Sequence, residues 1–262
     1  MEQEIMYDIP TFWIVLGLIS GMFGAMFVGR KIGTGRPPRD ESETGQVTAT
    51  QASLLGILGL LLGFTFSVAL GRHDARSAAV VSEANAIGTA WLRQDLLSDP
   101  GQVNAMMKLY VTERVSASTI PASQASERDR HVLLAEQAFA ALWAEAARIA
   151  QTTPNPANVA FTNALNDVID ELSSRDAAIE RHVPEIVLIM LYATFLLSGG
   201  LLGYASGVGR TRISATALVM PILIVSLVFV IIDLDRPRRG LIVVDQGPLE
   251  AVAASMGIAI DN

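Results

Sequence analysis

Apolar residues along the chain gather into four runs that contain no charged side chain. Each run approaches or exceeds the ~18–20 residues that a helix needs to cross a bilayer, and charged segments separate the runs. The pattern therefore predicts four transmembrane helices. The runs are Phe12 to Gly29, Val47 to Gly71, Ile186 to Gly209 and Ile213 to Ile232.

The second run continues into an amphipathic stretch, with no proline or turn cluster between the two. We interpret the range from Ala52 to about Leu97 as one helix that crosses the bilayer and continues into water. At 1.5 Å per residue it would be about 69 Å long, more than twice the ~30 Å of the hydrocarbon core. Residues 30–51, which carry charges and Pro37-Pro38, are expected to form a polar loop before it.

Past Gly71, apolar residues recur at intervals of three and four and predict a face that packs in a helical bundle. Arg72, Arg76 and Glu83 fall along a different face, for which a solvated, salt-bridged surface is the simplest interpretation. The apolar stripe consists of Val80, Ala84, Ile87 and Trp91.

Three further amphipathic segments come before the third apolar run, bounded by turn residues such as Pro121 and Pro154. Ser126 is expected to cap the middle one. Together with the continuation of the second transmembrane helix, they predict an antiparallel bundle large enough to have its own core. The segments are about Gln102 to Ser116, Glu127 to Gln151 and Ala157 to His182.

The predicted fold is all-α, with four transmembrane helices and an extramembrane helical bundle inserted between the second and the third. Residues 1–71 hold the first two transmembrane helices with their connecting loop, and residues 72–183 hold the bundle. Residues 184–232 hold the third and fourth transmembrane helices, and residues 233–262 form a charged exit and a C-terminal tail.

Small residues recur at every fourth position along three of the predicted transmembrane helices. At that spacing they line one side of a helix and let another backbone approach closely, which is how membrane helices associate. We therefore expect helix packing at these positions. The ribbons are Gly17, Gly21, Ala25 and Gly29; Gly59, Gly63, Ser67 and Gly71; and Gly199, Gly203 and Gly207.

Composition narrows the classes of function. The net charge is −7 and only two of the nineteen basic residues are lysine, so no basic patch resembles a nucleic-acid footprint. The absence of cysteine excludes thiol catalysis, disulfides and cysteine-ligated metal. The three histidines are dispersed and no catalytic motif is present, so the sequence predicts no enzyme, no metal site and no cofactor. No Asp, Glu, Lys, Arg or His lies within a span, which argues against a proton relay but permits a pore lined by Ser, Thr and aromatic groups.

Basic residues near the predicted transmembrane helices give the orientation. Six lie on each side, but those from Arg30 to Arg39 and those at Arg210 and Arg212 occupy two short loops, where the rule applies best. We therefore expect a multi-pass protein of the cell (inner) membrane, with both termini and the bundle outside the cytoplasm.

Five charged residues crowd the exit of the fourth transmembrane helix. One interpretation is an interfacial stop, since charges resist entering hydrocarbon. In the other, the arginines form ion pairs, or bind a lipid headgroup or an anion that approaches a pore mouth. The residues are Asp233, Asp235, Arg236, Arg238 and Arg239.

Two segments resemble those of a family of bacterial membrane proteins called bestrophin-like, and the similarity covers nearly the whole chain. They are GLLLGFTFSVALGRHDARSAAVVSEANAIGTAWLRQDLL and FVIIDLDRPRRGLIVVDQGPL. The resemblance implies kinship with bestrophins, which are pentameric anion channels whose second membrane helix lines the pore with a hydrophobic neck. Phe64 and Phe66 are then the neck candidates, with Ser67 as a further pore-lining candidate. Because bestrophins keep their large helical domain in the cytoplasm, the resemblance places the bundle on the side opposite to that given by the charge count.

The leading hypothesis is an integral membrane protein that forms a channel-like, anion-conducting homo-oligomer in the lipid bilayer. The alternative is a membrane sensor or scaffold whose helical bundle binds a partner or a small ligand. A conductance in reconstituted bilayers separates the two hypotheses.

Overall fold

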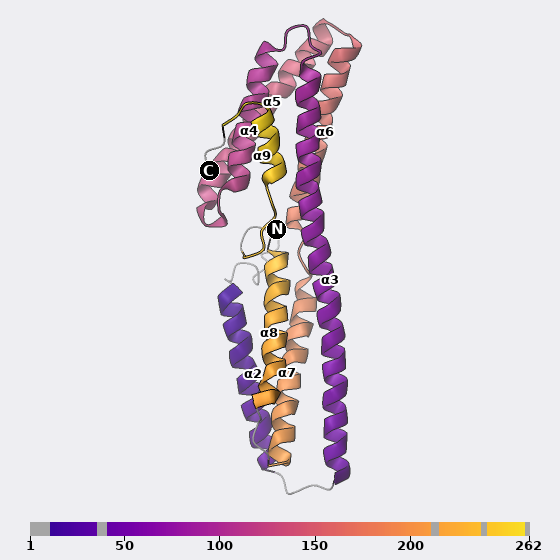
Figure 1. Cartoon of the computed structure of the whole chain (residues 1–262), viewed down its shortest axis with the longest axis vertical. Coiled ribbons are helices and arrows are strands. Elements are labelled where there is room, and N and C mark those ends of the chain that lie inside the picture. Colours follow the sequence, from indigo (N-terminus) through magenta and orange to yellow (C-terminus); the bar gives the residue numbers. More distant parts are fainter. Residues whose placement is uncertain (1–10, 36–40, 211–214, 237–239, 260–262) are drawn as a thin grey trace. The chain divides into compact units, whose positions relative to one another are not determined.

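The structure, a computed structural model, describes residues 11–35, 41–210, 215–236 and 240–259, and every regular element in these ranges is helical (Figure 1). The all-α prediction is confirmed for this part of the chain. Three stretches within it are long and apolar enough to cross a membrane: Phe12–Thr34, Gly45–Gln94 and Pro156–Val208. The elements are α2 (Thr11–Thr34), α3 (Glu41–Gln94), α4 (Gly101–Thr119), η1 (Ala122–Gln124), α5 (Ala125–Thr152), α6 (Pro156–Glu180), α7 (Glu185–Val208), α8 (Ala215–Asp235) and α9 (Gly247–Ser255).

The helices form two compact units. Unit 1 contains α2, the part of α3 up to Arg72, α7, α8 and the short segment Gly240 to Ile242. Unit 2 contains α3 from His73 onward, α4, η1, α5, α6 and the segment from Val243 that includes α9. Each unit has its own core of buried apolar residues.

Helix α3 is unbroken over 54 residues, so the prediction of one long helix is confirmed. Its start differs from the expectation, because residues 41–51 belong to the helix although they are predicted as loop. No proline occurs between Pro38 and the apolar run, and adding turns to an existing helix costs far less free energy than nucleating one. For the same reason α2 continues past Gly29 to Thr34.

The core of unit 1 lies between one face of α3 and the helices α2, α7 and α8 (Figure 1). Helix α2 packs along α7 and also contacts α8. The buried side chains recur at intervals of three or four along each helix, as expected for helices that present one face to a core. They include Leu58 and Leu62 of α3, Met22 and Met26 of α2, Leu191 and Phe195 of α7, and Val228 and Ile231 of α8.

In unit 2, α4 packs against α5 and α9, and α5 packs against α6. The second half of α3 contributes Ile87 to the same core. The rings of Tyr110 and Phe139 meet edge to face, with their centroids 5.2 Å apart. Leu249 and Ala253 of α9 are buried in this core, so α9 packs within unit 2.

One predicted helix cap is wrong. Ser126 lies inside α5, which begins at Ala125 directly after η1. The turn bond from the Gln124 N–H to the Pro121 carbonyl, 3.0 Å long, starts the helical winding before Ser126. At α6 the N-cap is Asn155, whose side chain accepts a hydrogen bond from the Asn158 N–H at 2.9 Å.

Candidate functional site

Helix α3 has two unlike faces within unit 1. On its open face Phe64 is 64% exposed and Ser67 is also exposed, whereas Phe66 is half-buried and packs against the core. A Cβ added at Gly59 or Gly63 would meet no atom of the described chain within 4 Å. Two of the three pore candidates are therefore exposed, as the ribbon glycines are, and Phe66 is not. The opposite, buried face consists of Leu58, Leu62, Thr65 and Ala69.

The glycines of α7 lie where α2 approaches most closely. A Cβ on Gly203 would overlap the backbone of Met26, and one on Gly207 would overlap the backbone of Arg30. From the other side, a Cβ on Gly29 would overlap the carbonyl of Gly200. The two backbones touch, which residues without a side chain permit.

The other predicted packing glycines of α2 and α7 have looser surroundings. A Cβ on Gly199 would overlap the thioether of Met22, and one on Gly21 would lie 3.0 Å from Leu196 Cδ2. Both obstacles are flexible side chains. Gly17 has no described neighbour within 4 Å of such a Cβ. The same four-residue spacing thus occurs at a closed interface and on open faces.

The carboxylates at the exit of α8 hold backbone N–H groups within unit 1. Asp233 Oδ2 accepts hydrogen bonds from the N–H groups of Leu241 and Ile242, at 2.9 and 2.8 Å. Asp235 Oδ2 accepts one from the Val183 N–H at 2.9 Å. Hydrogen bonds to an ionised acceptor are shorter and stronger than neutral ones. These two carboxylates therefore fix the chain after α8 and the chain before α7, a role that neither interpretation of the sequence includes.

The three arginines of this exit are only partly described. Arg236 is buried in unit 1, whereas Arg238 and Arg239 lie outside the described residues. Contact of these arginines with a headgroup or an anion therefore stays a prediction.

Unit 2 contains a buried ion-pair cluster. Glu83 of α3 is 0% exposed, and its carboxylate forms ion pairs with two guanidinium groups. Arg114 of α4 donates from Nε to Oε1 at 2.6 Å and from Nη2 to Oε2 at 3.3 Å. Arg175 of α6 donates from Nη1 to Oε2 of Glu83, and from Nη2 to Gln246 Oε1 at 2.7 Å. One carboxylate thus links α3, α4, α6 and the segment before α9.

The direct ion pairs of this cluster join two guanidinium groups to one carboxylate, and the charge of Asp176 also acts on Arg114. Burial lowers the pKa of Arg114, but the charge and the hydrogen bonds of Glu83 outweigh burial and raise that pKa overall. Burial, and then the Glu83 charge, raises the pKa of the neighbouring Tyr110 phenol, so the phenol stays neutral. A buried charge is costly unless a counter-charge compensates it.

The interpretation of Arg76 and Glu83 as a solvated surface is wrong, since they are 1% and 0% exposed. A signal was present in the sequence: Arg76, Val80, Glu83 and Ile87 follow one another at intervals of four, three and four. That alternation is the spacing of a helix seam in a bundle core. It places both charges on the buried face of α3 and not on its outer surface.

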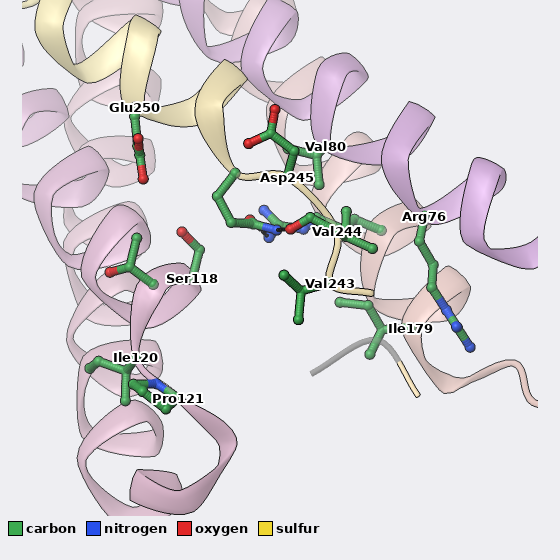
Figure 2. A pocket seen from close by; sticks show the side chains of 13 residues that line it. Arg76, Val80, Ser118, Ile120, Pro121, Ile179, Val243, Val244, Asp245 and Glu250 are labelled. Atoms are coloured by element: carbon green, nitrogen blue, oxygen red, sulfur yellow. Dashed lines mark hydrogen bonds between the residues drawn. The ribbon is translucent and has the colours of Figure 1, made fainter. Parts of the chain in front are cut away.

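A cavity of about 350 Å³ lies in unit 2 and has Arg175 in its wall (Figure 2). Figure 2 shows Glu250 and Ser118 at one side of the cavity, Arg76 at the other side and Val243 between them. The Arg76 guanidinium donates hydrogen bonds to two backbone carbonyls at the end of α6, at 3.1 and 2.6 Å. The cavity therefore joins basic groups, acidic groups and an apolar wall.

Comparisons with known proteins identify a matching family and solved structures of similar fold. The Bestrophin-like domain family matches residues 14–249. A bacterial Bestrophin homolog from Klebsiella pneumoniae is similar with a TM-score of 0.56 and 14% identity, over 91% of this chain and 95% of that one. A mutated form of that homolog gives 0.56 and 15% identity, over 91% and 96%, and a crystal structure of a membrane protein gives 0.57 and 13%, over 92% and 96%. Comparison with curated proteins gives no match.

The family match includes the open face of α3, the Glu83 cluster and the exit of α8. At 13–15% identity the solved structures show a common fold, and they extend over both units of this chain. The chain therefore belongs to the Bestrophin-like family.

Proposed function

We propose that this protein is a channel-like integral membrane protein that conducts anions as a homo-oligomer. The observation that carries the proposal is the open face of α3, where Phe64 and Ser67 lie exposed beside Gly59 and Gly63. Copies of α3 around a common axis put this face along a water-filled path, with Phe64 as the apolar constriction and Ser67 as a polar lining group. Kinship with bestrophins, which are anion channels, supports this arrangement.

The proposed topology has four membrane-spanning helices, namely α2, the first part of α3, α7 and α8. The three apolar stretches and the charge-free sequence of α8 up to Ile232 support it. Residues 1–71 and 184–232 then form the membrane part, residues 72–183 the extramembrane bundle, and residues 233–262 the exit and tail.

The side of the bundle is tested by labelling, which is simple because the chain has no cysteine. The charge count places the bundle outside the cytoplasm of an inner-membrane protein. In intact cells, Ser123→Cys should then react with an impermeant thiol reagent, and Ser42→Cys should be shielded. The reverse pattern would contradict this orientation and place the bundle in the cytoplasm, as in bestrophins.

Conduction is tested with two phenylalanines that are two residues apart on different faces of α3. Purified protein in planar bilayers should give an anion-selective current. Phe64→Ala should raise the unitary conductance without lowering thermal stability, because it removes an exposed ring from the constriction. Phe66→Ala is the matched control, which should lower thermal stability and leave the conductance unchanged, because Phe66 packs against the core. Assembled protein that carries no current would contradict the proposal.

The cavity in unit 2 favours a second function, that of a sensor or scaffold whose bundle binds a small ligand. Concave sites with a few convergent polar groups are where proteins hold small molecules. A protein that binds a ligand in unit 2 and carries no current under any condition would have this function alone.

A further inference from the structure

We propose that the cavity of unit 2 binds a small amino carboxylate, a zwitterion with one carboxylate and one ammonium group. The residues that carry the inference all belong to unit 2, and none of them lies on the open face of α3. The site therefore goes beyond the proposed channel function, and it can be tested without measuring a current.

Arg175 gives the cavity its anion-binding end. The side chain is 3% exposed and lines the cavity, and its Nε–H has no hydrogen-bond partner in the part of the chain that the structure describes. Its two terminal nitrogens are already engaged, one with Glu83 and one with Gln246. A buried donor without an acceptor costs free energy, which an acceptor inside the cavity would recover.

The charge of the cluster selects an anion as that acceptor. Glu83 is shared by two guanidinium groups, and no other carboxylate of the described chain forms an ion pair with Arg175. A carboxylate bound in the cavity would accept the unpartnered Nε–H of Arg175 and give this guanidinium a second anionic partner. Charge-assisted bonds of this kind are about twice as strong as neutral ones.

The part of the cavity at Glu250 suits a cation. Glu250 and Asp245 are acidic residues of the cavity wall, and neither forms an ion pair within the described ranges. The last turn of α4 lies on the same side, and the free carbonyls of a helix C-terminus carry partial negative charge. Ser118 of that turn donates its hydroxyl hydrogen to the Val115 carbonyl at 2.8 Å, so its oxygen is left as an acceptor. Figure 2 shows the Glu250 carboxylate above this hydroxyl.

A ligand with both charges suits a wall that carries both basic and acidic groups. A plain anion would be repelled by Glu250 and Asp245, and a plain cation by Arg175. Between the ends, Val80 and Ile179 offer an apolar wall for a short hydrocarbon chain. A volume of about 350 Å³ is at the small end of ligand sites and has room for a molecule of amino-acid size.

The test uses the purified full-length protein in detergent and isothermal titration calorimetry. The probes are glycine and its unbranched ω-amino homologues, each with the plain carboxylate and the plain amine of the same length. At least one amino carboxylate should bind about tenfold or more tightly than its two single-charge counterparts. Equal binding of the plain carboxylate would overturn the zwitterion, and absence of binding by every probe would overturn the site.

Two variants locate the binding. Glu250→Gln should weaken the binding of the amino carboxylate by about tenfold, since it removes the charge that faces the ammonium. It should leave the affinity for the plain carboxylate unchanged. Val243→Trp should abolish binding by filling the cavity from an exposed position. The matched control is Glu171→Gln, a half-buried carboxylate of α6 outside this cavity, which should bind as the parent does.

Thermal unfolding of each variant checks that it is folded, and Glu250→Gln alone decides the matter if Val243→Trp does not fold. Binding that survives Glu250→Gln undiminished would mean that the amino carboxylate binds elsewhere, and the proposal would be wrong. None of these outcomes depends on conductance, so failure of this site leaves the channel proposal standing.

Discussion

Two glycine ribbons with the same four-residue spacing have opposite surroundings in unit 1. Along α7, Gly203 and Gly207 lie so close to the α2 backbone that a Cβ would overlap it. Along α3, Gly59 and Gly63 have no described atom within 4 Å of such a Cβ. The spacing creates a surface on which another backbone can lie, but it does not specify which backbone. We propose that the chain closes the first ribbon by itself and leaves the second for assembly around a pore.

The largest effect on stability is expected at the closed ribbon. Gly203→Leu should force α2 away from α7, because the obstacle is the backbone of Met26, which cannot rotate aside. We expect little folded protein, or a loss of about 3 kcal/mol in the free energy of unfolding. Folded yield and thermal unfolding in detergent measure it. Stability equal to that of the parent would show that α2 and α7 do not pack in this register.

A smaller effect is expected where the neighbour is a side chain. Gly199→Ala meets the thioether of Met22, which is unbranched and can adopt another rotamer. We expect a loss of about 1 kcal/mol, less than for Gly203→Ala in the same assay. The opposite ranking of the two alanine variants would contradict the contacts described here.

The smallest effect on the stability of the chain is expected at the open ribbon. Gly63→Leu should change the unfolding free energy of the dissociated protein by no more than about 0.5 kcal/mol. It should nevertheless change the oligomer mass in detergent, because the new side chain stands on the proposed assembly surface. Gly17→Leu, which also has no described neighbour, is the control and should change neither quantity. If Gly63→Leu alters neither one, the α3 ribbon faces lipid.

The helical architecture is predictable from the sequence because periodicity and the absence of breakers act locally. Helix α3 follows from an apolar run that passes into an amphipathic one without a proline. The glycine spacing is equally visible, but its outcome depends on the residue opposite. Gly203 contacts a backbone only because Met26 of α2 lies opposite it. That contact depends on the tertiary structure and not on the local sequence.

The partners of the charged residues are the feature of the structure that is hardest to predict from the sequence. Glu83 binds Arg114 and Arg175, which are 31 and 92 residues away in sequence, so no local pattern links them. The interval from Arg76 to Glu83 does indicate a buried seam. Charged residues are nevertheless expected on the surface when the neighbouring sequence shows no partner for them. In the same way, the bonds from Asp233 to the Leu241 and Ile242 N–H groups depend on a turn of the chain that has no sequence signal.

The most direct test of the central claim is the current through Ser67→Cys protein in a planar bilayer while a charged thiol reagent is added. The chain has no other cysteine, so the reagent modifies one position on the open face of α3. Thr65→Cys, on the buried face, is the control. The pore proposal predicts that the current through Ser67→Cys protein changes at once and that the current through Thr65→Cys protein does not. An unchanged current through protein shown by mass spectrometry to be modified at position 67 would contradict it.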